Sequence, residues 1–386
     1  MSQPIYLAGA VRTPIGRIGG TLAGLSAPDL GEHAARAALE RSGVPADAVD
    51  QTLFGHGRQA GAGPNPGRQV SIRAGVPDSA PAWTVNMACG SGLKTGMLGA
   101  DAIRLGQAEV VLAGGMESMS NTPYMLPRAR WGYRLGDAKI VDGMYKDGFM
   151  CPLADQLMGA TAENLVDRYD LTRDEQDAYA VRTQGRCEAA RKAGGFDAEK
   201  IGIPLKDRKK GEYVFETDEH ARDGVTLEKM AKLPAVFRED GSVHAGNASG
   251  ITDGAAAYVV LSAAAAEKHG VTPMARLVDY TEAGVDPKVM GLGPVPAVRA
   301  LLERNGLSVG DVDLWELNEA FAAQVLACNR ELGIDEELLN VKGGAIALGH
   351  PIGATGARIL ATLLHAMEER GASRGVATLC ISGGMG

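Results

Sequence analysis

The stretch "LERSGVPADAVD" at residues 39–50 returns near the other end of the chain as "LERNGLSVGDVD" at residues 302–313. The two stretches share Leu, Glu, Arg, Gly, Val and Asp at a constant offset of 263 residues, from position 39 to position 302. Around them, strand-like and helix-like segments alternate, which is typical of an α/β chain whose sheets are covered by helices. We therefore predict that the chain contains two copies of one α/β unit.

The same offset joins two windows rich in glycine. Adding 263 to position 89, within "NMACGSGLKTGM" (86–97), gives position 352, within "GHPIGATGAR" (349–358). Each window opens a helix rich in Gly and Ala. If the two copies pack about a two-fold axis, the two helix starts converge. The repeat therefore predicts that Cys89 and His350 lie close together.

Further segments fit the same pattern. Apolar runs such as "AEVVLAGG" (108–115) and "DGAAAYVVLS" (253–262) predict buried strands, and "PDLGEHAARAALERSG" (28–43) predicts a helix. Each glycine-rich helix leads to a strand that ends in a glycine pair, in "VVLAGGM" (110–116) and in "TLCISGGM" (378–385). These landmarks follow one another in the same order in both copies, which favours duplication over chance similarity.

The segment from about 119 to 249 has no counterpart in the second copy, and we interpret it as an insertion that covers the core and forms one wall of a site. The expected division is therefore a first half of residues 1–118 and 250–268, an inserted loop domain of residues 119–249, and a second half of residues 269–386.

Composition excludes several classes of protein. Glycine accounts for 52 of 386 residues, inside apolar patterned segments, which indicates close backbone packing. The net charge of −8 argues against a nucleic-acid or membrane-surface partner, and the apolar run at 255–266 is too short to span a membrane. The five scattered cysteines form no C-x-x-C pair, so neither a disulfide framework nor a metal site is expected. With no signal-peptide pattern at the start, we expect a cytoplasmic protein.

The chemistry of Cys89 depends on its place at a helix start. A thiol beside unpaired backbone N–H groups and the positive end of a helix dipole has a lowered pKa, which favours the nucleophilic thiolate. A small buried structural thiol is the alternative, and this window alone leaves both open. His350 precedes a proline at a tight turn, and a Cys–His pair is a known way to activate a thiol.

Two more positions carry candidate chemistry. Cys380 lies near the end of a predicted strand before a glycine turn, where a thiol is placed to exchange protons while N–H groups bind an oxyanion. A buried cysteine without chemistry remains an alternative there. Asn318 ends another predicted strand, and helix capping is the alternative for it.

Four motifs, "NMACGSGLKTG", "NEAFAAQ", "GGAIALGHPIGATGAR" and "CISGGMG", resemble those of the thiolase family in order and spacing, and "GNASGITDGAAA" (246–257) and "LMGATAEN" (157–164) resemble further family segments. The resemblance runs from about residue 3 to residue 386. It implies an α/β thiolase-like fold: two similar βαβαβ halves with stacked sheets in a layered α/β/α/β/α core, plus the inserted loop domain.

The resemblance also implies a reversible ping-pong acyl transfer on coenzyme A thioesters. Cys89 matches the nucleophile that forms the acyl-enzyme, and His350 matches the base that keeps it as thiolate. Cys380 matches the acid/base that moves the second proton. Asn318 matches the residue that holds a water, which with His350 forms one oxyanion hole. The backbone N–H groups of Cys89 and Ser382 match the second.

Coenzyme A enters as substrate and product, and the resemblance implies no metal and no permanently bound cofactor. Its adenine–pantetheine track and the acyl pocket are expected at six positions that match family segments: Met158, Arg222, Ser249, Ala320, Met290 and Phe321. The segment at 128–144 resembles the loop that ties dimers into tetramers, so we expect a homotetramer, with no nucleic-acid or membrane partner.

The chain departs from the family pattern at three places. Ser382 stands where the family turn has the first of three glycines, the sequence stops at Gly386 where the family continues into one more strand, and Leu157 stands where short-chain enzymes often have His. The last leaves open both 3-ketoacyl-CoA thiolysis in fatty acid metabolism and acetoacetyl-CoA formation. The alternatives are a catalytically dead CoA-binding scaffold, a ketosynthase-type condensing enzyme and a cysteine hydrolase.

Overall fold

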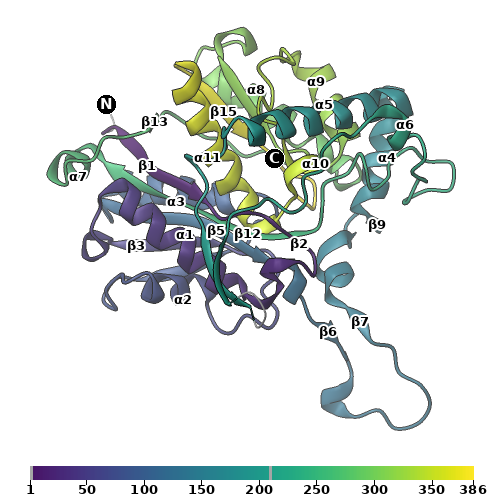
Figure 1. Cartoon of the computed structure of the whole chain (residues 1–386), viewed down its shortest axis with the longest axis horizontal. Coiled ribbons are helices and arrows are strands. Elements are labelled where there is room, and N and C mark those ends of the chain that lie inside the picture. Colours follow the sequence, from purple (N-terminus) through teal and green to yellow (C-terminus); the bar gives the residue numbers. More distant parts are fainter. Residues whose placement is uncertain (1–2, 208–210) are drawn as a thin grey trace.

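The computed structural model, in which residues 3–207 and 211–386 are described, has a core of one seven-stranded sheet and one two-stranded sheet, and three further two-stranded sheets lie in the segment 119–249 (Figure 1). The large sheet runs in the order β13-β1-β12-β5-β3-β4, with β2 beside β12. Strand β12 is antiparallel to β1 and β5, whereas β3 is parallel to β5 and β4. The bounds are β1 (Ile5–Arg12), β2 (Gly16–Arg17), β3 (Gln51–Gly55), β4 (Ala82–Val85), β5 (Val110–Ser118), β12 (Thr252–Ser262) and β13 (Ala275–Leu277).

Helices cover both faces of this sheet. Alternate side chains of a strand point to opposite faces, and in β12 the two sets join different apolar clusters. Val259 and Leu261 pack in the cluster of α1 (Ala27–Ser42), whereas Tyr258 and Val260 pack in the cluster of α3 (Ser91–Arg104) and α11 (Ile352–Arg370). All residues of β5 and β12 are buried, as expected for central strands covered on both faces.

Local sequence explains where the first helix begins and ends. Ser26 and Asp29 form a capping box at the start of α1, in which the Ser26 side chain accepts from the Asp29 backbone N–H and the Asp29 carboxylate accepts from the Ser26 backbone N–H. Gly43 ends the helix with a φ of 73°, a left-handed conformation that glycine adopts without strain. The helix predicted over 28–43 is thereby confirmed.

The small sheet lies on the far side of α11, which contacts both of its strands. It contains the parallel strands β14 (Leu314–Leu317) and β15 (Gly375–Thr378). The helices α8 (Pro294–Arg304) and α9 (Ala322–Leu332) pack on the face of this sheet that points away from α11. The order of layers is thus helix, sheet, helix, sheet, helix, as predicted. Shifting β3 by the offset of 263 gives 314–318, so β3 and β14 occupy equivalent places in the two copies.

Strand β13 lies in the large sheet, where it pairs with β1, with Ile5 opposite Leu277. One detail of the predicted repeat is wrong, because the two glycine pairs are not equivalent. Gly114, in the first pair, lies inside β5, and adding 263 to its number gives Ala377 within β15. Gly383, in the second pair, lies after β15, in a turn where its φ is 90°.

The two glycine-rich helices cross at close range. A Cβ atom on Gly92 of α3 would lie 2.7 Å from the backbone nitrogen of Ala357, and a Cβ atom on Gly356 of α11 would lie 2.3 Å from the backbone nitrogen of Leu93. Side chains at either position would push the helices apart. The crossing brings together the two helix starts that the repeat predicted to converge.

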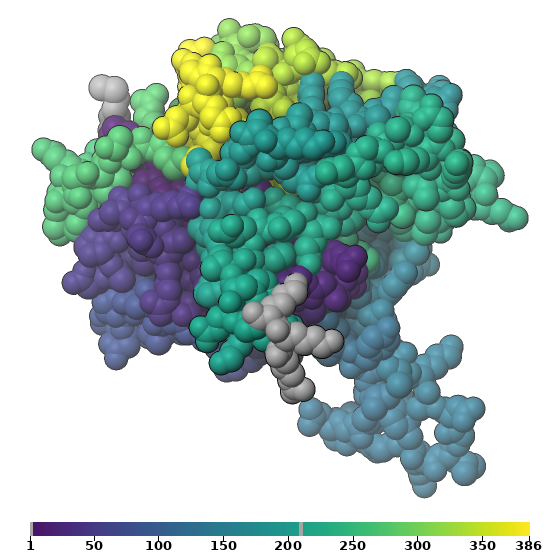
Figure 2. Space-filling model, viewed as in Figure 1, coloured from purple at the N-terminus to yellow at the C-terminus, as the bar shows by residue number. Residues whose placement is uncertain are grey.

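The segment at 119–249 surrounds this core. Figures 1 and 2 show that part of it, around β6 (Tyr124–Met125) and β7 (Val141–Asp142), projects from the body as a long arm. Trp131 and Leu135 in this arm are 85% and 99% exposed. The remaining elements of the segment are η3 (Met119–Asn121), η4 (Ala129–Trp131), η5 (Tyr145–Phe149), β8 (Met150–Cys151), β9 (Gln156–Leu157), α4 (Met158–Tyr169), α5 (Arg173–Lys192), β10 (Ile203–Asp207), β11 (Gly211–Phe215) and α6 (Leu227–Met230).

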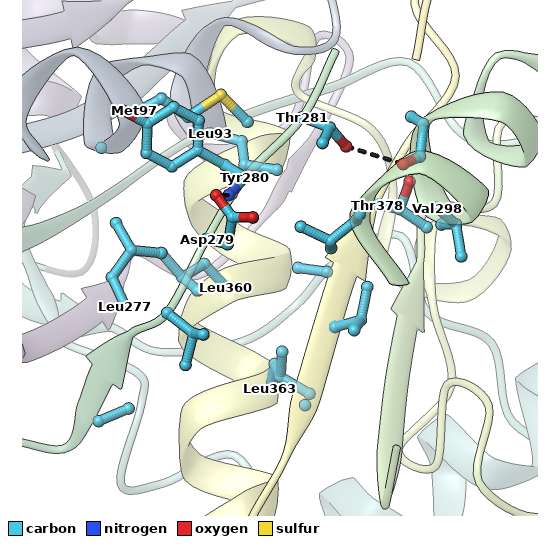
Figure 3. A pocket seen from close by; sticks show the side chains of 18 of the residues that line it. Leu93, Met97, Leu277, Asp279, Tyr280, Thr281, Val298, Leu360, Leu363 and Thr378 are labelled. Carbon is cyan, nitrogen blue, oxygen red and sulfur yellow. Dashed lines mark hydrogen bonds between the residues drawn. The ribbon is translucent and has the colours of Figure 1, made fainter. Parts of the chain in front are cut away.

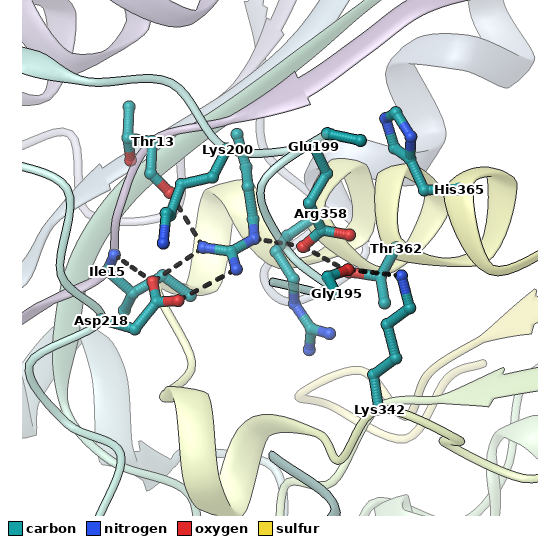
Figure 4. Close-up of polar contacts among 12 residues, drawn as sticks. Thr13, Ile15, Gly195, Glu199, Lys200, Asp218, Lys342, Arg358, Thr362 and His365 are labelled. Atoms are coloured by element: carbon teal, nitrogen blue, oxygen red, sulfur yellow. Dashed lines mark hydrogen bonds and ion pairs between the residues drawn. The ribbon is translucent and has the colours of Figure 1, made fainter. Parts of the chain in front are cut away.

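A buried ion cluster fastens this segment to the large sheet (Figure 4). Arg12 of β1 pairs with Glu199 at 2.5 Å and with Asp218 at 2.7 Å, and all three side chains are buried. Burial alone would lower the pKa of Arg12, but the two carboxylates outweigh it and raise the pKa. Burial likewise tends to raise the pKa of Asp218, but its contacts with Arg12 lower it overall, so Arg12 and Asp218 form a charged pair.

Shorter elements complete the described chain. They are α2 (Pro66–Arg73), α7 (Ala263–Lys268), α10 (Ala345–Leu348), η1 (Thr21–Gly24), η2 (Ala46–Ala48), η6 (Pro287–Leu292) and η7 (Val309–Asp311). Within residues 3–207 and 211–386, none of the helices combines the length and the apolar character needed to cross a membrane.

Candidate active site

Cys89 lies in a tight turn directly before α3, which begins at Ser91 as predicted. Ala88 adopts a left-handed conformation with a φ of 46°, which is uncommon for a residue other than glycine. Its backbone N–H donates to the Asn86 side chain at 3.0 Å, and its carbonyl accepts from the Ser91 hydroxyl at 2.6 Å. The Ser91 hydroxyl also accepts from the Met87 backbone N–H at 2.9 Å. These bonds hold the strained turn that presents the thiol.

The structure brings His350 to this thiol, as the repeat predicted. The distance from His350 Nε2 to Cys89 Sγ is 3.3 Å, and both side chains are buried. His350 Nδ1 lies 2.6 Å from the Thr355 hydroxyl, which itself donates to the Pro351 carbonyl at 3.0 Å. Because that proton of Thr355 is already used, the network assigns the hydrogen of the neutral imidazole to Nδ1. Nε2 is therefore free to accept the proton of Cys89.

Burial sets the protonation of this pair. The sequence predicted a lowered pKa for Cys89, but burial raises it, against the opposing effects of the Arg58 charge and the backbone N–H groups of Ser382 and Cys89. Burial, followed by the charges of Arg358 and Arg58, lowers the pKa of His350 to about 3. Both shifts favour a neutral thiol beside a neutral imidazole. The lowered pKa expected from the helix start omitted the desolvation of the charged form, which raises the pKa of Cys89 overall.

Cys380 and Ser382 follow β15 and line the same centre. Cys380 is buried, and burial followed by the charge of Cys89 raises its pKa well above the ordinary value. The backbone N–H of Ser382 is close enough to Cys89 to lower the pKa of that thiol. Ser382 does not adopt a positive φ, whereas Gly383 and Gly384 have φ values of 90° and 87°. Serine in place of the first family glycine is therefore accommodated without backbone strain.

Asn318 follows β14 and is buried beside Arg358 of α11. Its Oδ1 accepts from Arg358 Nη2 at 3.4 Å, which fixes the amide orientation because a guanidinium only donates. Its Nδ2 is buried and has no acceptor among the described residues. Leaving such a donor unpaired costs about 1–3 kcal/mol. The amide is thus ready to donate to an oxygen atom of a water or ligand.

Five of the six positions expected to contact coenzyme A lie in one region. Ser249 donates its backbone N–H to the Ala320 carbonyl at 2.9 Å, beside Phe321. Phe321 and Met290 belong to the apolar cluster that also contains Cys380, and Met158 at the start of α4 packs against it. The sixth position, Arg222, lies exposed at the surface.

Sequence reasoning missed several residues that order the centre. Thr355 orients His350, Arg358 orients Asn318, and Ser91 holds the thiol turn. Thr355 had a detectable signal, since it lies in the first turn of the helix that follows His350. No sequence signal pointed to Arg58, which lies three residues after β3 and whose charge acts on both members of the pair.

A cavity beside the small sheet is separate from these four side chains (Figure 3). It measures about 620 Å³ and is lined by residues of β13, α8, α11 and β15, including Leu277, Val298, Leu363 and Thr378. Its lining contains none of Cys89, His350, Cys380 and Asn318. Its size therefore does not identify it as the site of chemistry.

Two family models together cover nearly the whole chain. The model described as "Thiolase, N-terminal domain" matches residues 5–264, and that described as "Thiolase, C-terminal domain" matches residues 271–386. The chain belongs to the thiolase family. The predicted fold class is thereby confirmed, and this thiolase is similar along its length to characterised relatives.

Two bacterial relatives named acetyl-CoA acetyltransferase show the similarity in sequence. That of Cupriavidus necator is 51% identical over 99% of this chain and 97% of its own, and that of Pseudomonas aeruginosa is 52% identical over 100% and 98%. Among solved structures, the Bacillus anthracis acetyl-CoA acetyltransferase has a TM-score of 0.97 at 44% identity, covering 100% of this chain and 97% of that one.

The human mitochondrial 3-ketoacyl-CoA thiolase in complex with CoA has a TM-score of 0.95 to this thiolase at 43% identity, covering 99% of this chain and 96% of that one. These matches favour neither the ketosynthase alternative nor the scaffold alternative.

Proposed function

We propose that this thiolase transfers acyl groups between coenzyme A thioesters through an acyl thioester on Cys89. The observation that carries the proposal is the 3.3 Å contact from His350 Nε2 to Cys89 Sγ, with the other ring nitrogen held by Thr355. Such a pair is a nucleophile with its base, and the base is oriented by a third group.

In the first half-reaction, Cys89 Sγ attacks the thioester carbonyl while His350 Nε2 takes the thiol proton. The new bond from Sγ to the acyl carbon forms, the bond from that carbon to the sulfur of coenzyme A breaks, and His350 returns the proton to the leaving thiolate. Charge on the carbonyl oxygen is met by fixed donors: the backbone N–H groups of Cys89 and Ser382 for one step, and a water on Asn318 with His350 for the other.

In the second half-reaction, the acyl group passes to the acceptor. For carbon–carbon bond formation, Cys380 first gives its thiol proton to solvent, and the thiolate then takes the α-proton of a second acetyl-CoA. The carbanion attacks the acyl carbon, the bond from that carbon to Cys89 Sγ breaks, and the Cys89 thiolate takes up a proton from solvent. For thiolysis, the Cys380 thiolate deprotonates the incoming thiol of coenzyme A, whose sulfur replaces Cys89 Sγ on the acyl carbon in the same way. The raised pKa of Cys380 makes its thiolate a strong base, which suits removal of a weakly acidic proton.

The names of the relatives support the substrate class. Acetyl-CoA, acetoacetyl-CoA and longer 3-ketoacyl-CoA esters are the proposed substrates, with a place in fatty acid metabolism, and no permanently bound cofactor is proposed. The wall formed by 119–249 would hold coenzyme A, with Met158, Ser249 and Ala320 along its track, Met290 and Phe321 at the acyl pocket, and Arg222 toward its nucleotide end.

A homotetramer in the cytoplasm is the proposed state of the protein. The projecting arm supports it, because Trp131 and Leu135 are large apolar side chains left in contact with solvent. Sedimentation of the intact chain against a variant with both residues changed to Ser tests this assembly. A wild-type monomer would contradict it.

The Cys380→Ser variant tests the division of labour. It should still form an acyl-enzyme from acetyl-CoA, because Cys89 and His350 remain, but it should lose most acetoacetyl-CoA formation because the serine hydroxyl does not ionise to supply the base. Full condensation by this variant, or loss of acyl-enzyme formation with the fold intact, would contradict the proposed roles.

A further inference from the structure

Arg58 is tied to the catalytic helix through one carboxylate. Its backbone N–H donates to Glu117 Oε1 at 3.0 Å, and the Gly353 backbone N–H in the first turn of α11 donates to Glu117 Oε2 at 2.9 Å. Gly353 is three residues from His350. The position of Arg58 relative to the Cys89–His350 pair is thus fixed by the backbone.

The guanidinium of Arg58 has no partner within residues 3–207 and 211–386. The residue is only 8% exposed, its Nε is buried without an acceptor, and no ion pair or side-chain hydrogen bond satisfies it. The carboxylate of Glu117 is already occupied. Its Oε1 also lies 3.1 Å from His56 Nε2, and its Oε2 also accepts from the Gly57 backbone N–H at 3.0 Å. A largely buried guanidinium whose Nε has no acceptor, and which forms no ion pair with the described residues, is costly, which points to an anion supplied from outside the chain.

The same covering segment closes over Arg58 and Cys89. A Cβ atom on Gly148 would lie 2.8 Å from Arg58 Nε and Nη2, so the absence of a side chain there leaves space for the guanidinium. Met144 and Phe149, which flank this glycine, pack in the apolar cluster of Cys89. The same short segment therefore packs against both the guanidinium and Cys89. The effect of the Arg58 charge on the pKa of Cys89 and of His350 agrees with this proximity.

We propose that Arg58 is a specificity-determining residue that binds a carboxylate at the far end of the acyl group, so that this thiolase accepts short dicarboxylic acyl-CoA thioesters. A guanidinium pairs with a carboxylate by charge-assisted hydrogen bonds, often two in parallel. The chemistry of transfer is unchanged: the acyl–sulfur bond moves from coenzyme A to Cys89, and the Cys89 proton passes through His350 to the leaving thiolate. The inference rests on the proposed acyl-enzyme at Cys89.

An alternative use of the cation is to stabilise the Cys89 thiolate for every substrate. The two uses differ in what removal of the charge does. Loss of a carboxylate-binding group lowers the rate with carboxylated substrates relative to others, whereas loss of a thiolate-stabilising group lowers both rates in parallel.

Succinyl-CoA and butyryl-CoA make a matched pair of probes, because each acyl group has four carbons and only one ends in a carboxylate. The measured quantity is the ratio of the rates at which the two thioesters acylate the full chain. Each rate is obtained by quenching the reaction at successive times and measuring the intact-protein mass. Wild type should be acylated by both at comparable rates. Arg58→Met should lower the succinyl-to-butyryl ratio about 10- to 100-fold, the range expected for one hydrogen bond to a charged group.

Arg370→Met is the control, since Arg370 is an exposed residue at the end of α11 and its loss changes the net charge equally. Arg58→Lys should retain part of the preference. A succinyl-to-butyryl ratio that changes less than threefold in a folded Arg58→Met variant would overturn the proposal. A wild-type protein that is acylated by butyryl-CoA but not by succinyl-CoA would also overturn it. Failure of acetyl-CoA itself to acylate wild type would instead contradict the proposed function.

Discussion

Thr355→Val removes one hydroxyl from the centre and keeps the shape of the side chain. In the wild type, His350 Nδ1 lies 2.6 Å from this hydroxyl, and both residues are buried. Valine leaves the Nδ1–H without an acceptor, at a cost of about 1–3 kcal/mol. It also removes the preference for the tautomer that leaves Nε2 free toward Cys89. If this free energy is lost from the transition state, the rate of acylation by acetyl-CoA should fall about 10- to 100-fold.

The assay is single-turnover acylation of Thr355→Val, quenched in acid and read by intact-protein mass. Thr355→Ser is the matched control, because it restores the hydroxyl and should recover most of the rate. Thermal melting of both variants separates loss of function from loss of fold. A folded Thr355→Val protein that acylates within twofold of wild type would refute the argument that this hydroxyl orients the base.

Three further predictions concern stability, measured by urea unfolding. Gly356→Ala should destabilise the protein by about 1–3 kcal/mol or more, since the new Cβ would lie 2.3 Å from the Leu93 backbone nitrogen. The control is Gly185→Ala in α5, which should be neutral or stabilising because a Cβ there has no neighbour within 4 Å. Equal effects of the two substitutions would contradict the close crossing of the helices. Asp218→Asn should cost about 3 kcal/mol because it leaves a buried guanidinium with one carboxylate instead of two, and a change under 0.5 kcal/mol, taken as roughly the scatter of surface substitutions, would contradict a charged cluster. Folding lowers the pKa of His350 from 6.5 to about 3, so the unfolded chain takes up a proton as the pH falls below 6.5 while the folded chain does not. Between pH 7 and pH 5, the free energy of unfolding of the wild type should therefore fall by about 2 kcal/mol more than that of His350→Asn. Parallel curves of unfolding free energy against pH for the two proteins would contradict the neutral imidazole.

The order of segments along the chain was enough to predict an α/β chain with two copies of one unit and the meeting of Cys89 with His350, whereas the layered core was predicted from the family resemblance. The offset of 263 residues placed the two helix starts at equivalent points, and the structure has β3 and β14 at equivalent points as well. A repeat in sequence specifies which elements correspond, and packing about a pseudo-two-fold axis then brings equivalent ends together.

Other features depend on tertiary contacts that no local pattern encodes. The helix start at Ser91 predicted a lowered pKa for Cys89, but the surrounding layers bury the thiol and reverse the shift. The pairing of β13 with β1 instead of the small sheet depends on a register between segments some 270 residues apart, roughly the separation of Ile5 from Leu277. Arg58 lies in a loop with no periodicity, and the hydrogen bonds of Glu117 tie that loop to the start of α11.

The most direct test of the account is the intact-protein mass after brief incubation with acetyl-CoA and no acceptor, followed by peptide mapping. We predict one acetyl group per chain on the peptide that contains Cys89, and none in the Cys89→Ala variant. An unmodified wild-type protein that still binds acetyl-CoA, or an acetyl group at another residue that persists in Cys89→Ala, would contradict the central claim.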